Sequence, residues 1–265
     1  MKQQGTTIRL DKFLANAGLI SRRGVKQFLK ENTITIDGKR ATESGTRVGQ
    51  QQQVLLNGTA IKKPGFVYFM LNKPIGIISS TADEFARDTV ISLIDTNERI
   101  YPVGRLDKDT HGLVLLTNDG ELTHQLIHPK YHVAKVYRLT VAGMPNRKQI
   151  EQLREGVILT DGITLPAEVQ MVENKKVVIS NEHERSRQKI SRQTRNVRDQ
   201  SIVEVSIHEG RNRQIRRMCE AVGIQLLDLQ RIAFGPLQLG NLKKGEYREL
   251  TKQEVQKLRN VVAKK

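Results

Sequence analysis

The sequence is a basic chain of 265 residues, long enough at ~100 to 200 residues per domain for one large domain or two unequal ones. Its 44 Lys and Arg against 28 Asp and Glu leave a net charge of +16, which indicates a polyanionic partner rather than a particular fold. The single cysteine, Cys219, excludes an internal disulfide, and no apolar run reaches the ~18 residues of a membrane span, so we expect a cytoplasmic protein.

The first sixty residues predict a small unit of two helices followed by short strands. Apolar residues spaced i, i+3, i+4 and i+7 predict a helix over about residues 9–18, which ends at Gly18. Ser21 is placed to cap a second helix. The segment 33–36 has the β-branched residues of a strand and ends in an Asp37-Gly38 turn.

The composition changes at residues 62–65, Lys-Lys-Pro-Gly, where we expect a hinge. Beyond it, short strands and helices follow one another without a regular strand-helix-strand repeat. We therefore predict an α+β fold with a small N-terminal domain over residues 1–62 and a second domain over 66–252, whose mixed, mainly antiparallel sheet is flanked by helices. Residues 253–265 are expected to form a basic helical tail.

Positive charge is concentrated in the N-terminal unit. Residues 1–63 hold twelve Lys or Arg against four acidic residues, so the local net charge is 12 − 4 = +8, half of the whole excess. Arg22, Arg23 and Lys26 are expected in the first turns of one helix, where the helix dipole also favours phosphate. This arrangement predicts a phosphate-binding surface.

A second basic segment, residues 181–200, carries six Arg or Lys and only two aliphatic residues. It cannot bury much apolar surface. We expect either a solvated, disordered loop or a basic insertion that becomes ordered on nucleic acid.

The N-terminal unit also contains an ordered set of motifs: Arg9-Leu10-Asp11, Gly18, Ser21-Arg22-Arg23 and a short strand ending in Asp37-Gly38. In this order they resemble the S4 RNA-binding domain over about fifty residues. The resemblance implies that the unit binds structured RNA by its shape and backbone. The expected RNA contacts in this unit are Arg9, Lys12, Arg22, Arg23 and Lys26.

Residues 101–120, YPVGRLDKDTHGLVLLTNDG, have the highest density in the chain of charged and polar side chains that can take part in catalysis. A carboxylate between two apolar strands can line a cleft and stay rigidly placed. Asp107 and Asp109 are alternatives for that role, and each also fits a turn residue that bonds its own backbone.

Residues 208–223, HEGRNRQIRRMCEAVG, predict a turn that enters a helix ending at Gly223. Arg213, Arg216 and Arg217 fall on one stripe near the start of this helix and can hold phosphates or a carboxylate. Ion pairing on a surface helix is the alternative, weakened because few acidic residues are close in the sequence.

Two further segments carry weaker signals. Tyr137 lies on the alternating strand KVYRLTV, where a core aromatic is the more common role than a stacking platform. Lys73-Pro74 and Gly76 stand at a strand end in FMLNKPIG, which is typical of a tight turn.

Four segments follow one another behind the S4-like unit: NKPIG, GRLDKDTHGLVLLTNDG, KVYRLTV and EGRNRQIRRMCEAVG. Together they resemble the RsuA/RluB/RluE/RluF family of rRNA pseudouridine synthases over roughly residues 8 to 250. The strings around Asp107 and Arg216 look most like the RluF type, which acts on a uridine of large-subunit rRNA, the pseudouridine 2604 type.

The resemblance implies that a monomer isomerises uridine to pseudouridine without cofactor or metal. Its implied substrate is ribosomal RNA, with the large subunit preferred and tRNA as a second candidate. Asp107 is implied to act on the ribose as nucleophile or proton abstractor, and Arg216 to keep that carboxylate charged against the effect of burial. Tyr137 would stack on the target base, and Ile215 would close the pocket.

The family also implies roles for other basic residues. Arg105 would enter the RNA stack when the base flips out, and Lys73 would support the Arg105-Leu106-Asp107 turn or contact the RNA backbone. We expect RNA contacts from Arg211, Arg213 and Arg217. The chain departs from many relatives at His111, where they have Ser, and in its basic segment 181–200.

Two other functions, metal binding and RNA binding without catalysis, account for parts of the sequence. His124, His128 and His132 are spaced by four, but Pro129 interrupts them and no HExxH frame or cysteine cluster is present, so we expect no zinc site. A non-catalytic S4-domain factor in ribosome assembly or rescue explains the charge equally well. It leaves the arrangement of Asp107, Tyr137 and Arg216 unexplained.

Overall fold

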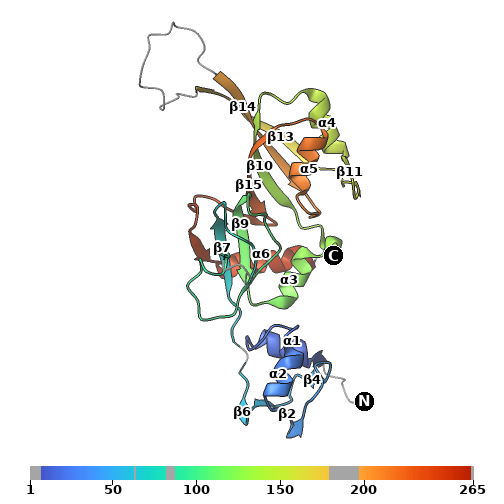
Figure 1. Ribbon diagram of the computed structural model, residues 1–265, viewed down its shortest axis with the longest axis vertical. Coiled ribbons are helices and arrows are strands. Elements are labelled where there is room, and N and C mark those ends of the chain that lie inside the picture. Colours follow the sequence, from blue (N-terminus) through green and yellow to red (C-terminus); the bar gives the residue numbers. More distant parts are fainter. Residues whose placement is uncertain (1–6, 63, 82–86, 179–196, 264–265) are drawn as a thin grey trace.

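The computed structural model of the chain describes residues 7–62, 64–81, 87–178 and 197–263. It has a small N-terminal unit followed by a larger unit built on one long sheet (Figure 1). Of the basic segment 181–200, residues 181–196 lie outside the described residues, so its two expected states are untested. In the described part of the chain, no helix has the length and apolar run required to cross a membrane.

The N-terminal unit contains two helices and two small antiparallel sheets. Its elements are β1 (Thr7–Arg9), α1 (Leu10–Asn16), α2 (Val25–Glu31), β2 (Ile34–Ile36), β3 (Lys39–Arg40), β4 (Arg47–Gly49), β5 (Val54–Leu56) and β6 (Thr59–Ala60). β1 pairs with β4, and the other four strands form a sheet in the order β3-β2-β5-β6. The predicted turn at Asp37-Gly38 is confirmed, since both residues have the positive φ of a tight hairpin turn.

The second helix starts later than predicted. Ser21 Oγ accepts a hydrogen bond from the amide of Gly24 at 3.2 Å, which closes a turn, and α2 begins only at Val25. Arg22 and Arg23 therefore lie in the turn before α2, and the prediction that they occupy its first turns is wrong. The Ser21 side chain satisfies a backbone donor, but that donor belongs to the turn.

The second unit holds the remaining elements. They are β7 (Tyr68–Lys73), β8 (Tyr101–Pro102), β9 (His111–Thr117), α3 (Gly120–Ile127), the 3-10 turn η1 (Pro129–Tyr131), β10 (Lys135–Ala142), α4 (Arg147–Glu155), β11 (Ile158–Leu159), β12 (Gly162–Ile163), β13 (Glu168–Val178), β14 (Val197–Ile207), α5 (Gln214–Ala221), β15 (Leu226–Phe234), β16 (Leu237–Gln238), β17 (Tyr247–Glu249) and α6 (Lys252–Ala263). The main sheet runs β13-β14-β10-β15-β9-β7-β17, with β16 beside β15 and β8 beside β9. β15 and β9 are parallel and the other described pairs are antiparallel, so the predicted mixed, mainly antiparallel sheet is confirmed.

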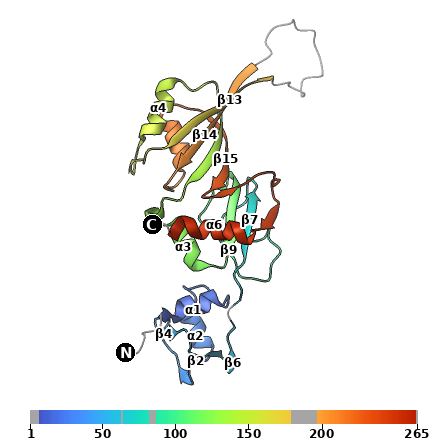
Figure 2. The same ribbon diagram turned by 180° about the vertical axis from the view of Figure 1, so that it is seen from behind.

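Helices cover both faces of this sheet. On one face, Ile150 of α4 and Met218 of α5 pack into the larger apolar core with Tyr137 and Leu139 of β10. On the other face, α3 and α6 enclose a second core that includes Leu113 of β9. Figure 2 shows α3 and α6 beside the β7 and β9 end of the sheet, whereas α4 lies at the β13 and β14 end.

β9 and β15 approach each other closely at Gly112. Its φ is +108°, and a Cβ atom there would lie 2.2 Å from the carbonyl oxygen of Arg231, so only glycine fits. This contact places the beginning of β9, and the turn that precedes it, directly beside β15.

Candidate active site

The turn that carries Asp107 is held by the loop that follows β7. Ser79 Oγ donates to the carbonyl of Leu106 at 3.0 Å and accepts from its amide at 3.1 Å. The amide of Gly76 donates to the carbonyl of Lys108 at 2.8 Å. Hydrogen bonds on both sides of Asp107 therefore fix its backbone just before the start of β9.

Asp109 clamps the same turn onto the start of α5. Arg213 donates Nη1 to Asp109 Oδ1 at 3.1 Å and Nη2 to Oδ2 at 2.9 Å. Arg216 donates Nη2 to the carbonyl of Asp109 at 2.8 Å and to Thr110 Oγ1 at 3.3 Å. Its Nε also lies 3.3 Å from Asp109 Oδ2, close enough for an ion pair although the hydrogen-bond geometry is poor. The clamp fixes the position of α5 relative to Asp107.

The charge of Asp109 is secured by its partners. Burial tends to raise the pKa of Asp109, but the hydrogen bond from Arg213 and the positive charges of Arg216 and Arg213 outweigh it and hold that pKa below its ordinary value. Asp109 is therefore ionised at neutral pH and keeps both guanidinium groups in place.

The expected contact between Arg216 and Asp107 is not made. Among the described residues, Arg216 bonds to Asp109 and Thr110 and forms no hydrogen bond or ion pair with the carboxylate of Asp107. The reason is geometric: Asp109 faces α5 and accepts the arginines, whereas Asp107 lines a cavity.

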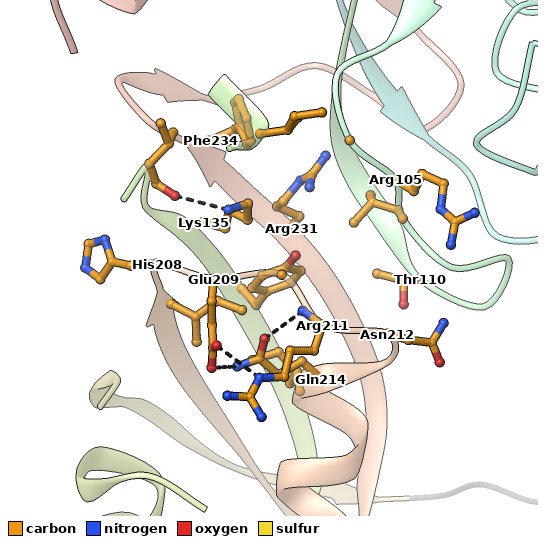
Figure 3. Close-up of a pocket in the computed structure, with 18 of the residues that line it drawn as sticks. Arg105, Thr110, Lys135, His208, Glu209, Arg211, Asn212, Gln214, Arg231 and Phe234 are labelled. Carbon is orange, nitrogen blue, oxygen red and sulfur yellow. Dashed lines mark hydrogen bonds and ion pairs between the residues drawn. The ribbon is translucent and has the colours of Figure 1, made fainter. Parts of the chain in front are cut away.

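This cavity has a volume of about 350 Å³ and lies at the start of α5 (Figure 3). That size falls within the ~300 to 1,000 Å³ of ordinary ligand pockets. The predicted site residues that line it are Arg105, Asp107, Tyr137, Arg211, Arg213 and Ile215. The structure thus brings together residues from the 104–110 turn, from β10 and from α5, which are far apart in the sequence.

Tyr137 belongs to the core and to the cavity wall at once. Its exposed fraction is 9%, it packs in the larger core, and it lines the cavity. The two interpretations of this residue, a core aromatic and a platform for a base, are therefore compatible. Burial of one part of the ring leaves the other part rigidly placed.

A row of residues crosses the sheet beneath the site. Lys73 pairs with Gly112, Gly112 with Arg231, and Arg231 with Tyr137. Side chains of residues directly opposite each other lie on the same face of a sheet. Because Gly112 has no side chain, the backbone of β9 can approach the backbone of Arg231 closely at this point of the row.

Lys73 is fully buried, at 0% exposure. Its Nζ donates to the carbonyls of Pro74 at 3.0 Å and Ile77 at 2.8 Å. Burial lowers the pKa of Lys73 to about 8, against the opposing charges of Asp109 and Asp107. Lys73 does not line the cavity and its ammonium group is bonded to the loop, so of its two expected roles the structure favours support of the loop beside the Asp107 turn.

The other arginines near α5 are engaged by the protein. Arg217 makes two hydrogen bonds to Asp161, at 2.9 and 3.1 Å. Arg211 pairs with Glu209 at 3.0 Å and donates to the carbonyl of Gly162 at 2.9 Å. Asp161, like Asp109, comes from a distant part of the chain. The charges of Arg217 and Arg213 are therefore balanced by acids that are not close in the sequence. RNA contacts by these arginines stay a prediction.

Three residues shape the site although the sequence analysis did not single them out: Ser79, Lys135 and Arg231. Arg231 is 1% exposed and alternates along β15 with the buried Leu229 and Ala233, and a charge at such a core position is a usable signal. Lys135 lies two residues before Tyr137 on β10 and therefore on the same face of the strand, which is a weaker signal. The hydrogen bonds of Ser79 depend on loop geometry and had no signal in the sequence.

His111, His124 and His128 each lie beside another side chain of the protein. His111 is 3% exposed, and its Nε2 lies 2.9 Å from Asp228 Oδ2. The rings of His124 and His128 are 5.3 Å apart. Over the described ranges, no group of three or more His, Cys, Asp or Glu is arranged to hold a metal ion.

The basic surface of the N-terminal unit is partly neutralised. Arg9 and Arg22 both reach the buried Asp11, at 3.3 and 3.1 Å. Lys12 pairs with Glu121 of α3 at 2.5 Å, which links the two units. Arg23 is exposed.

The comparisons with known proteins cover almost the whole chain. A family model described as RNA pseudouridylate synthase matches residues 67–221, and one described as S4 domain matches residues 8–51. Ribosomal large subunit pseudouridine synthase B of Bacillus subtilis (strain 168) is 40% identical over 252 residues, which cover 95% of each chain.

Dual-specificity RNA pseudouridine synthase RluF of Escherichia coli (strain K12) is 30% identical over 253 residues, covering 94% of this chain and 78% of that one. This identity is lower than that to the B-type relative, although the motifs look most like the RluF type. A crystal structure of a pseudouridylate synthase aligns with a TM-score of 0.63 at 29% identity and covers 95% of this chain and 99% of that one.

Proposed function

The chain belongs to the RNA pseudouridylate synthase family, and from this premise we propose that it isomerises uridine in large-subunit ribosomal RNA with Asp107 as the catalytic carboxylate. One observation carries the assignment of Asp107: it lines the same cavity as Tyr137 and Ile215, on a turn that hydrogen bonds hold rigidly. Asp109, the alternative in the sequence, has its carboxylate occupied by arginine.

The reaction rearranges one nucleotide. The bond between N1 and C1′ breaks, the base turns, and C5 bonds to C1′; C5 loses a proton and N1 gains one, so the atoms balance. Asp107 acts on the ribose, either as the nucleophile or as the group that abstracts a proton. Tyr137 stacks against the everted base, and Ile215 closes the cavity over it. Arg105, exposed at the cavity, fills the space that the base leaves in the RNA stack.

Two cations, Arg213 and Lys73, lie in the electrostatic field of Asp107. The hydrogen bond to Asp109 and the charges of Asp109 and Asp107 raise the pKa of Arg213, against the effect of burial. Lys73 lies in the field of the same two carboxylates. Arg216, in contrast, is paired with Asp109. We therefore propose that Arg213 and Lys73 supply the positive charge beside Asp107.

The substrate class follows from the relatives. The relative with 40% identity is named for the large ribosomal subunit, which supports large-subunit rRNA as the substrate here. The 2604-type uridine, tRNA as a second substrate and a monomeric state are predictions from the RluF-like motifs. We propose the cytoplasm as the location, because the relatives are bacterial and the proposed substrate is ribosomal RNA.

Tritium release tests this function. Large-subunit rRNA transcribed with 5-tritiated uridine should release tritium when the wild-type protein is added, since C5 loses its hydrogen as it bonds to C1′. Asp107→Asn should reduce the release to background while RNA affinity, measured by filter binding, stays unchanged. Release by Asp107→Asn at the wild-type rate would transfer the catalytic role to another group, and no release by the wild type would favour a protein that only binds RNA.

A further inference from the structure

The cavity extends beyond the residues assigned to catalysis. Asp107, Tyr137 and Ile215 line one part of it, and Lys135, Arg231 and Phe234 line another. Figure 3 shows Lys135 and Arg231 on the same side of the cavity, with Phe234 beside them. The proposed reaction gives this second part no role.

Lys135 and Arg231 are held against one aromatic ring. Lys135 Nζ lies 6.0 Å from the centroid of the Phe234 ring, and the guanidinium carbon of Arg231 lies 5.3 Å from it. Strand register explains the arrangement, because Lys135 is opposite Phe234 and Tyr137 is opposite Arg231. Two cations therefore share one small region beside the proposed platform for the base.

Their hydrogen bonds leave donors unused. Arg231 donates Nε to the carbonyl of Leu113 at 2.7 Å, and its Nη2 is buried without a hydrogen-bond partner in the described structure. Lys135 donates to the carbonyl of Val133 at 3.2 Å. A buried guanidinium donor without a partner costs free energy, so its retention in a cavity wall indicates a ligand that accepts from it.

Glu209, the acid whose charge acts on Lys135, is engaged by other partners. Glu209 accepts from Arg211 Nε at 3.0 Å, from Gln214 Nε2 at 2.7 Å and from the amide of Leu165 at 2.9 Å. Burial and the charge of Arg231 lower the pKa of Lys135 to about 8, although Glu209 opposes them. Two like charges in a half-enclosed cavity destabilise each other unless an anion binds between them.

We propose that Lys135 and Arg231 form an anion subsite that binds a backbone phosphate adjacent to the everted uridine. The inference rests on the proposed function, because that function supplies an RNA strand to the cavity. Lys135 and Tyr137 are two residues apart on one strand, a separation of about 7 Å along β10, so a nucleotide whose base stacks on Tyr137 carries its phosphate within reach of Lys135. Charge-assisted hydrogen bonds from lysine and arginine are the usual means of phosphate binding.

Nucleotide binding tests the subsite without turnover. Uridine, uridine 5′-monophosphate and uridine 3′-monophosphate are titrated into the full-length protein by calorimetry. The wild type should bind one of the monophosphates about tenfold more tightly than uridine. Lys135→Gln should lose that preference while uridine affinity holds, and Lys135→Arg should keep it. Lys148→Gln, which removes an exposed lysine from α4, is the matched control and should behave as the wild type.

Two results would overturn the subsite: equal binding of uridine and both monophosphates by the wild type, or an undiminished preference in Lys135→Gln. Thermal unfolding of each variant verifies that it is folded, and Lys135→Arg keeps the test valid if the glutamine variant is unstable. The outcome is separate from the proposed function. If the wild type releases tritium and Lys135→Gln still binds a monophosphate more tightly than uridine, only the subsite is rejected. If Lys135→Gln loses that preference for a monophosphate and the wild type releases no tritium, only the isomerase function is rejected.

Discussion

At the scale of single residues, two aspartates in one turn have different environments. Asp107 lines the cavity, and Asp109 accepts two hydrogen bonds from Arg213 and lies in the field of Arg216. The local pattern left these carboxylates as alternatives because both fit a turn, and the family resemblance assigned the reaction to Asp107. The packing of α5 separates them, and we propose that Asp109 is a positioning residue whose effect on the reaction passes through the placement of Asp107.

Removing the charge of Asp109 should weaken the clamp on the turn. Asp109→Asn is expected to lower kcat for tritium release by about 100-fold, because small misplacements of a catalytic group have effects of that size, while KM for RNA changes little. The matched control is Asp161→Asn, since Asp161 makes the same two-bond contact with Arg217 on the same helix. Equal activity of the two variants would show that Asp109 does not position the site.

At the scale of elements, α6 covers the face of the sheet that carries the second core. Leu258 and Val262 are buried in the second core, so the predicted basic tail packs against the sheet unit as a helix. Its start is a capping box: Thr251 Oγ1 accepts from the amide of Glu254 at 3.2 Å, and Glu254 Oε2 accepts from the amide of Thr251 at 2.9 Å. Arg248 adds a charged partner to Glu254 at 2.6 Å.

The pairing of Glu254 predicts a pH dependence of stability. The hydrogen bond from Arg248, followed by the bonds from Thr251, lowers the pKa of Glu254 from 4.5 to about 2, against the effect of burial. Since this pKa is depressed in the folded state, its contribution to stability is complete above pH 4.5 and is lost as the pH falls toward 2. Glu254→Gln keeps an acceptor for the capping box but removes the charge. In urea unfolding, the free energy of unfolding of this variant should therefore depend less on pH between 4.5 and 2. Glu155→Gln, on the exposed end of α4, is the control, and an identical profile for both variants would contradict this account.

At the scale of the whole molecule, the net charge of +16 is distributed unevenly. Half of it lies in the first 63 residues, yet Arg9 and Arg22 are paired with Asp11, and Lys12 is paired with Glu121 of the second unit. Arg23 is exposed in the turn before α2. The part of the basic surface that is ready to bind phosphate is therefore smaller than the composition suggests.

Neutralising Arg23 should weaken RNA binding for all sequences alike. Arg23→Gln is expected to reduce the slope of log affinity against log salt by about one unit if it removes one phosphate contact. The measurement is fluorescence anisotropy with rRNA fragments between about 50 and 200 mM salt. Lys148→Gln on α4 removes one positive charge away from this surface and should leave the slope unchanged. An affinity that does not depend on salt would refute the role of the basic surface.

Much of the local structure and the family of the chain could be predicted from the order of its residues alone. Turn residues such as Asp37-Gly38, the apolar spacing of the helices and the alternation of the strands depend on neighbours in the chain, so they could be predicted. Motifs read in order were sufficient to identify the RNA-modifying family. The start of α2 was misplaced because the Ser21 side chain satisfies a turn and a helix start in the same way.

Which side chains meet, in contrast, depends on how the strands and helices pack. The register of β7, β9, β15 and β10 sets Lys73, Arg231 and Tyr137 in one row, and the docking of α5 gives Arg216 to Asp109 instead of Asp107. Strand register and helix docking depend on the packing of residues that lie from 112 − 73 = 39 to 231 − 112 = 119 positions apart. No local pattern contains that information, because a contact over such a distance is chosen by the fit of whole surfaces.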